Sequence, residues 1–164
     1  MRRILPALFL TASALVGLAI PAAAQDAGDA ARGQKLADTC MGCHGVPNYR
    51  NAYPSYAVPK LAGQHPEYVF IALQGYKAQT RKHPTMYAQA ATLSDKDMRD
   101  LAAYLAGSAP LKDGSPVDGA GKDKSTACVA CHGEGGRSQM PNWPVLAGQK
   151  ADYIEHALHQ YKSG

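Results

Sequence analysis

The residues best suited to chemistry are four cysteines arranged in two short motifs, each closed by a histidine. Both motifs have the pattern Cys-x-x-Cys-His, and their members are Cys40, Cys43 and His44 in the first and Cys128, Cys131 and His132 in the second. Two thiols with two residues between them share one helical turn, so each can add to one vinyl group of a single haem, and the next residue brings an imidazole to the iron. The spacing therefore predicts two covalently bound c-type haems (haem c), with the four cysteines as thioether attachments and the two histidines as iron ligands.

Other uses of cysteine pairs fit this pattern less well. An even number of cysteines in an exported chain is typical of disulfides, but the spacing and the paired histidines point elsewhere. A thioredoxin-like redox pair normally lies in a βαβ unit, which the sequence does not predict. A zinc ribbon joins cysteine pairs roughly 15 to 20 residues apart, whereas 84 residues separate Cys43 from Cys128.

The first 24 residues have the layout of a signal peptide. Arg2 and Arg3 precede an uncharged apolar stretch over residues 4–20, and small alanines at 22–24 end the segment before Gln25. We therefore expect residues 1–24 to be cleaved during export, which makes the mature protein periplasmic. The alternative is an uncleaved membrane anchor, because the 17 residues of the apolar stretch could nearly span a bilayer.

The charge balance of the mature chain is close to neutral. The whole chain has 17 Lys plus Arg against 13 Asp plus Glu, and removal of Arg2 and Arg3 leaves 15 against 13, a net charge of +2. This weak charge argues against a nucleic-acid partner.

An internal repeat relates the two halves of the chain. The motifs lie 88 positions apart, and the sequence Leu-Ala-Gly-Gln recurs after 85 positions, at 61–64 and 146–149. Nine of 19 positions are identical between 61–79 and 146–164. A duplicated domain, with a three-residue insertion in the first copy, explains both offsets.

The repeat sets the expected domain boundaries. After the signal peptide, the first cytochrome c domain is expected over residues 25–107, and the second over 120–164. A stretch rich in Gly, Ser, Pro and Asp, residues 108–119, is the expected linker. Adding 85 to the end of the first copy, Ala106, puts the end of the second at position 191, so we expect the second domain to lack its C-terminal helix.

The apolar periodicity predicts an all-α fold of two tandem domains, each with a few short helices around its haem. In the first copy, helices are expected over 29–39, from Pro66 to about Gln79, and up to Ala106 after Ser94 as N-cap. Gly33 in the first of these is either a point of close helix packing or a weak point in the helix. No alternating stretch is long enough for a sheet.

The sixth ligand of the first iron must come from outside the attachment motif. Met86 is the predicted ligand, because it lies in an expected irregular segment, residues 80–92, that can cross the open face of the haem. A methionine that only fills a gap is the alternative. Met41 lies inside the motif, Met98 lies on the core face of a helix, and His83 is the competing ligand.

The second iron has no matching methionine within the sequence. The repeat places it at position 171, so we expect the sixth ligand beyond residue 164. The other candidates are Met140, His156 and His159, and each lies at an unsuitable position in the repeat. If the chain ends at Gly164, this iron is five-coordinate.

Two further groups of polar residues have open interpretations. His65, just before Pro66, is expected to be a surface residue at a helix start. Lys77, Arg81 and Lys82 cluster near the predicted distal segment, where they neutralise haem propionates, guide an acidic partner, or form a solvated surface.

The paired motifs, together with Pro-x-Leu-Ala-Gly-Gln at 59–64 and 144–149, make residues 28–164 similar to the dihaem cytochrome c4 family. The resemblance implies two class I cytochrome c domains related by a pseudo-twofold axis, with facing haem edges, and a role as a periplasmic electron shuttle. It also implies that His44 and Met86 ligate the first iron and His132 the second. The departure from the family is the missing end of the second domain.

These features predict an electron carrier rather than an enzyme. The expected donor is a bc-type complex or a dehydrogenase, the expected acceptor is a haem-copper oxidase, and no motif typical of catalysis is found. The alternative is a dihaem electron-accepting subunit of a dehydrogenase, such as flavocytochrome c sulfide dehydrogenase. The expected state is therefore a monomer or an enzyme subunit, with peripheral membrane association left open. A sensor or peroxidase that uses an open second iron is a third hypothesis.

Overall fold

The computed structural model describes residues 27–108 and 120–164. Within these residues the chain forms seven α-helices and one 3-10 turn, and the only β pairing is an isolated bridge between Arg50 and Ala57. The all-α prediction is confirmed. The expected signal peptide and residues 109–119 of the expected linker lie outside the described residues. No helix in the described part of the chain is long and apolar enough to cross a membrane.

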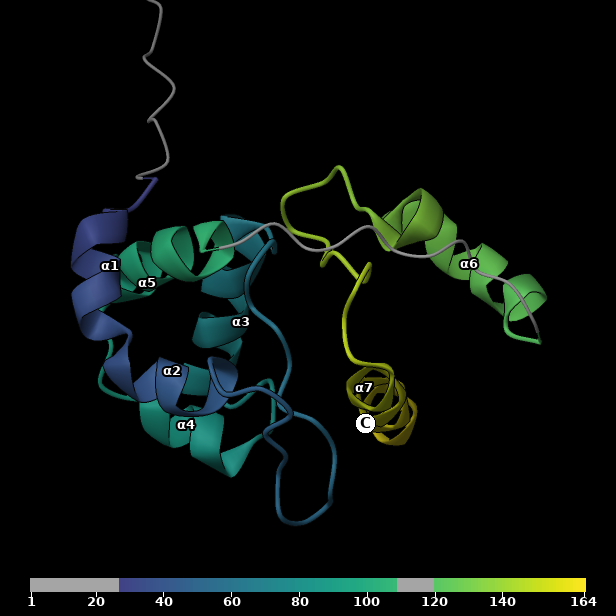
Figure 1. Cartoon of the computed structure of the whole chain (residues 1–164), viewed down its shortest axis with the longest axis horizontal. Helices are drawn as coiled ribbons and strands as arrows, with labels where there is room; N and C mark the ends of the chain where they lie inside the picture. Colours follow the sequence, from purple (N-terminus) through teal and green to yellow (C-terminus); the bar gives the residue numbers. More distant parts are fainter. Residues whose placement is uncertain (1–26, 109–119) are drawn as a thin grey trace, which may run out of the picture.

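Five helices build the first copy: α1 (Ala30–Leu36), α2 (Asp38–His44), α3 (Pro66–Lys77), α4 (Pro84–Ala90) and α5 (Asp95–Gly107). α1 and α3 both pack against α5, and α4 packs against α3, as Figure 1 shows. The core between them is apolar and centres on Met98, Leu101 and Ala102 of α5, which are almost fully buried. The helices α2 and α4 lie together below α1, α3 and α5 in the view of Figure 1.

Two predicted boundaries in the first copy are wrong. The single helix expected over 29–39 is divided into α1 and α2 at Ala37, which is 1% exposed and packs into the core. The segment 80–92 is not irregular throughout, because Pro84 opens α4 at a position where a missing N–H costs nothing. Met86 consequently lies in the first turn of a helix rather than in a loop.

The start of α5 is confirmed as predicted. The Ser94 hydroxyl accepts a hydrogen bond from the Asp97 N–H at 3.2 Å, and the Asp97 carboxylate accepts one from the Ser94 N–H at 3.0 Å. This reciprocal arrangement is a capping box. It anchors the helix against which the rest of the first copy packs.

Gly33 is a point of close packing between α1 and α5. A β-carbon added to Gly33 would lie 1.9 Å from the Asp100 carbonyl oxygen. The first of the two interpretations of this glycine is therefore correct.

The side chain of Asp100 joins the same two helices beside the core. It is fully buried, accepts from the Asp29 N–H at 2.7 Å and from the Lys96 ammonium at 2.9 Å, and pairs with the Arg32 guanidinium. The hydrogen bond from the Asp29 N–H, reinforced by Arg32, lowers the pKa of Asp100 from 3.8 to about 2. A buried charge is tolerated here because it is fully paired.

This carboxylate gives the first copy a defined acid response. A lowered pKa stabilises the fold fully above the unfolded value of 3.8, and the contribution disappears as the pH falls to about 2. Asp100→Asn is expected to lower the melting temperature at neutral pH, and the difference from the parent should shrink between pH 4 and pH 2. Thermal unfolding of both holoproteins across this range is the measurement. A difference that stays constant with pH would rule out the proposed charge pairing.

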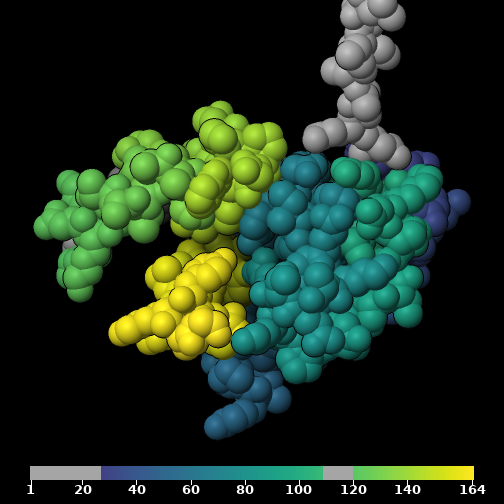
Figure 2. All heavy atoms as spheres, turned by 180° about the vertical axis from the view of Figure 1, so that it is seen from behind, coloured from purple at the N-terminus to yellow at the C-terminus, as the bar shows by residue number. Residues whose placement is uncertain are grey.

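The second copy contains α6 (Lys122–His132), the 3-10 turn η1 (Glu134–Gly136) and α7 (Ala151–Ser163). α7 begins 85 positions after α3, which is the offset of the sequence repeat. Figure 2 shows α7 lying against the first copy, whereas α6 in Figure 1 projects away from its helices. The predicted repeat is thus present in the helix positions as well as in the residues.

Candidate haem sites

The first Cys-x-x-Cys-His motif forms the last turn of α2. His44 is the final residue of this helix, and its Nδ1 lies 2.8 Å from the Pro59 carbonyl oxygen. Because a carbonyl can only accept, Nδ1 must carry the proton, which leaves the Nε2 lone pair of the neutral ring free for iron. Burial lowers the pKa of His44, which favours this neutral form.

The second motif repeats this arrangement at the end of α6. His132 is the final residue of the helix, and its Nδ1 lies 2.9 Å from the Pro144 carbonyl oxygen. The Trp143 ring meets the His132 ring edge-on, with centroids 5.6 Å apart. Pro144 is the repeat counterpart of Pro59, so the two histidines are oriented by equivalent carbonyl groups.

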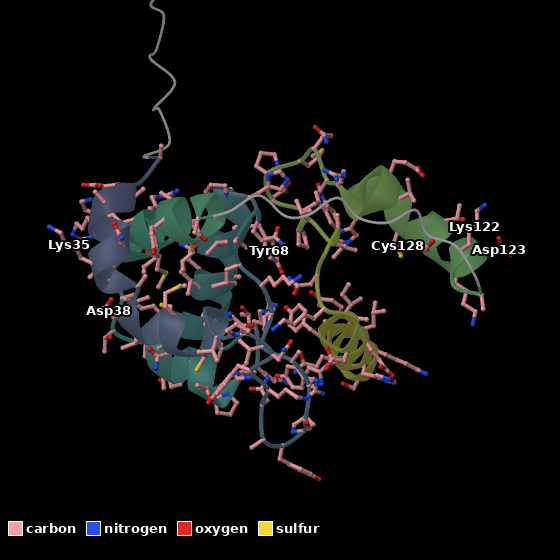
Figure 3. All side chains as sticks on the ribbon, in the orientation of Figure 1. Lys35, Asp38, Tyr68, Lys122, Asp123 and Cys128 are labelled. Atoms are coloured by element: carbon pink, nitrogen blue, oxygen red, sulfur yellow. The ribbon has the colours of Figure 1, made fainter. Side chains whose placement is uncertain are left out.

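None of the four cysteines of the two motifs is in a disulfide. Cys40, Cys43 and Cys131 are partly buried, and Cys128 on α6 is exposed, as its place in Figure 3 illustrates. Burial raises the pKa of the Cys40 thiol. In the described part of the chain, no three metal-binding side chains gather into a cluster. The thiols and histidines therefore present the donor set that covalent haem attachment needs, one set in each copy.

Met86 lies in α4, partly buried against the apolar core on which Cys40 also packs. The neighbouring His83 has a different use, because its Nδ1 accepts a hydrogen bond from the Met86 N–H at 3.2 Å. Nδ1 is then the acceptor of the neutral ring, and Nε2 carries the proton rather than a free lone pair. Met98 is fully buried in the core, and Met41 is 37% exposed in the motif. These surroundings favour Met86 over His83 as the sixth ligand, which stays a prediction.

The candidates named for the second iron have other contacts. The His156 ring stacks on the Tyr56 ring with centroids 3.8 Å apart. His159 lies 3.9 Å from the Glu155 carboxylate on an exposed face of α7, and Met140 is 53% exposed. None of these contacts directs the side chain toward His132.

Arg81, for which a solvated surface was one of three interpretations, joins the two copies. The Arg81 guanidinium donates to the Tyr68 hydroxyl at 3.0 Å and to the Tyr153 hydroxyl at 2.6 Å, and it lies 4.8 Å from the centroid of the Tyr76 ring. Tyr68 and Tyr153 are repeat counterparts, and Figure 3 shows Tyr68 on the side of α3 that faces the second copy. The interpretation of Arg81 as part of a solvated surface is therefore wrong.

His65 is also a contact between the copies. Its Nε2 lies 2.9 Å from the Ser138 carbonyl oxygen, and Ser138 is 4% exposed. A surface role was expected for His65, and no local signal in the sequence indicates this contact, because 73 positions separate the partners.

Two helices that each end in paired thiols and an oriented histidine define the chain as a c-type cytochrome with two haem sites. The family described as Cytochrome c matches residues 30–109. Cytochrome c4 of Azotobacter vinelandii is 35% identical to this chain, with 92% of this chain and 80% of the relative covered. The crystal structure of reduced recombinant cytochrome c4 from Pseudomonas stutzeri superposes with a TM-score of 0.64 at 30% identity, covering 84% of this chain and 82% of the other.

A third similar protein is the thiosulfate dehydrogenase electron acceptor of Stutzerimonas stutzeri, which is 31% identical over 82% of this chain and 72% of its own length. The chain belongs to the cytochrome c4 family. It therefore has two cytochrome c domains and two covalently bound c-type haems, and it is an electron-transfer protein rather than an enzyme. When bound, each haem supplies a one-electron Fe(III)/Fe(II) couple.

Proposed function

We propose that the chain is a periplasmic electron carrier that accepts one electron per haem from a bc-type complex or a dehydrogenase and delivers it to a haem-copper oxidase. The observation that carries the proposal is the equivalent setting of His44 and His132, each tied through Nδ1 to a proline carbonyl. A rigidly oriented proximal ligand keeps the iron geometry similar in both oxidation states, which suits electron transfer. The signal-peptide layout of residues 1–24 supports the location.

The proposed ligand set assigns a role to each motif residue. Cys40 and Cys43 attach haem 1, the haem of the first motif, and His44 with Met86 ligate its iron. In the second motif, Cys128 and Cys131 attach haem 2, and His132 ligates its iron.

The first test is the intact mass of the protein exported from its natural host. Residues 25 onward plus two haems are expected, and a mass with fewer than two haems contradicts the ligand assignment. The second test mixes the reduced holoprotein with membranes that contain a haem-copper oxidase. Cyanide-sensitive reoxidation of both haems supports the proposed acceptor, whereas reoxidation at the rate of the protein in buffer alone removes it.

A dehydrogenase subunit is the second candidate function, and the likeness to a thiosulfate dehydrogenase electron acceptor favours it. The natively exported protein, isolated at low salt and run through size exclusion, separates the two proposals. Co-elution with a dehydrogenase at constant ratio supports the subunit. A monomer that a dehydrogenase reduces in many turnovers supports the freely diffusing carrier.

A further inference from the structure

Two glutamines link the copies through a reciprocal set of hydrogen bonds. Gln149 accepts from the Lys60 N–H at 2.9 Å and donates to the Lys60 carbonyl at 2.9 Å. Gln64 accepts from the Val145 N–H at 2.8 Å and donates to the Val145 carbonyl at 2.7 Å. Gln64 and Gln149 are repeat counterparts, and so are Lys60 and Val145, so each copy holds the other by the same contact.

A glycine turn places each glutamine. Gly63 and Gly148 have φ values of 76° and 69°, a backbone region that glycine adopts without steric cost. Each turn is closed by a hydrogen bond from the glutamine N–H to the leucine carbonyl three residues earlier, at 3.2 Å in the first copy and 3.1 Å in the second. The side-chain amide therefore projects from a tight turn rather than from a flexible loop.

The peptide groups held in this way are the ones that orient the proximal histidines. The Lys60 N–H and the Pro59 carbonyl belong to one peptide unit, and that carbonyl accepts from His44 Nδ1. The Val145 N–H and the Pro144 carbonyl form the equivalent unit, which orients His132. In a trans peptide the N–H and C=O point in opposite directions, so the hydrogen bonds on its two sides form one continuous chain.

We propose that these glutamines act across the interface as positioning residues, so that Gln149 of the second copy tunes haem 1 and Gln64 of the first copy tunes haem 2. The proposal rests on the proposed ligation of the two irons by His44 and His132. The contact between the two copies then affects both reduction potentials, because a glutamine of each copy is hydrogen-bonded to the peptide group that orients the proximal histidine of the other.

The physics sets the direction of the effect. A hydrogen bond accepted from the peptide N–H polarises the peptide and makes its carbonyl a stronger acceptor. A stronger acceptor at Nδ1 makes the histidine a better electron donor to iron. Better donation favours Fe(III), so the glutamine lowers the reduction potential of the haem in the opposite copy.

The test uses the holoprotein with both haems and replaces one glutamine at a time with methionine, which has a similar shape and cannot make these hydrogen bonds. Redox titration followed by NMR, which separates the haem signals, reports each potential. Q149M is expected to raise the potential of haem 1 more than that of haem 2, and Q64M is expected to do the reverse. Shifts that are absent, equal for both haems, or confined to the haem of the substituted copy overturn the proposal.

Two controls separate the relay from simple loosening of the interface. Tyr153→Phe removes a different hydrogen bond between the copies, the one to Arg81, and leaves both glutamines in place. A looser interface would admit solvent to the haems, and solvent favours Fe(III) and lowers the reduction potential. Tyr153→Phe is therefore expected to raise neither haem potential. Q149E keeps an oxygen that accepts from the Lys60 N–H, so the haem 1 potential should not rise. A rise of the same size in Y153F or Q149E contradicts the relay.

Amide exchange provides a second measurement that is independent of the potentials. In the reduced, diamagnetic holoprotein, Q149M is expected to speed exchange of the Lys60 amide on the order of tenfold, with little change at Val145. Unchanged exchange at Lys60 also overturns the proposal. Failure of the proposed function is distinguishable, because it shows in the parent protein as missing haems or as absent electron exchange with its partners.

Discussion

Met86→Ala is expected to lower the reduction potential of haem 1 by a few tenths of a volt, within the range of about 0.8 V that axial ligands span. A thioether ligand favours Fe(II), and its loss leaves a position open to water, which favours Fe(III). The reduced variant should also bind carbon monoxide at haem 1, which the parent iron with two protein ligands resists. Redox titration and the optical spectrum after carbon monoxide addition are the measurements.

Two substitutions control for the neighbourhood of Met86. Met41→Leu replaces the partly exposed methionine of the attachment motif and is expected to leave the haem 1 potential nearly unchanged. His83→Ala removes the acceptor of the Met86 N–H and is expected to weaken the start of α4 without opening the iron to carbon monoxide. If H83A opens the iron and M86A does not, His83 is the ligand and the assignment of Met86 fails.

The sequence was most informative where the chemistry is local. The attachment motifs depend on residues within one helical turn, and the start of α5 depends on Ser94 and on a carboxylate three positions later. α7 begins 85 positions after α3, as the repeat does, because duplicated residues keep their helical positions. Covalent spacing and capping need no knowledge of the rest of the chain.

Contacts between the copies could not be predicted in the same way. The Gln64 contact with Val145 spans 81 positions, and the Arg81 contact with Tyr153 spans 72. Arg81 lies between Tyr68 and Tyr153 in space. The apolar periodicity of the sequence does not distinguish such a residue from a solvated one. Its contacts depend on the second copy, so a solvated surface, one of the three interpretations of this cluster, is wrong for Arg81.

Two local errors have tertiary causes. The break between α1 and α2 falls at Ala37, which is 1% exposed, and no helix propensity indicates that a break lies there. The helix α4 begins at Pro84 with His83 as its cap, although histidine is not among the preferred N-cap residues. His83 performs that function through Nδ1, and the same hydrogen bond lowers its suitability as a ligand. Both helix boundaries, the break at Ala37 and the start of α4 at Pro84, involve contacts that local sequence patterns do not indicate.

The Pro-x-Leu-Ala-Gly-Gln segment gains a physical explanation from the structure. Its proline supplies the carbonyl for the proximal histidine, and its glycine forms the turn that presents the glutamine. The glutamine then contacts the peptide that follows the proline of the other copy. One segment therefore orients a haem ligand in its own copy and contacts the equivalent segment in the other.

Gly33→Ala is expected to destabilise the first copy by more than about 3 kcal/mol, even though alanine normally favours a helix by about 1 kcal/mol over glycine. The added β-carbon would lie 1.9 Å from the Asp100 carbonyl oxygen, so α1 must move away from α5 and break the contacts of Asp100. For a domain of this size the melting temperature should fall by more than about 12 °C. Thermal unfolding of the holoprotein, followed by circular dichroism, is the measurement.

The matched control is Gly121→Ala, because Gly121 precedes the second motif by the same spacing as Gly33 precedes the first. A β-carbon at Gly121 meets nothing within 4 Å, so the melting temperature is expected to stay within a few degrees of the parent value. If the two substitutions have the same effect, the close approach of α1 to α5 does not decide the outcome. If only Gly33→Ala unfolds the protein, the contact between α1 and α5 is what requires glycine at this position, because the same substitution in an open setting is tolerated.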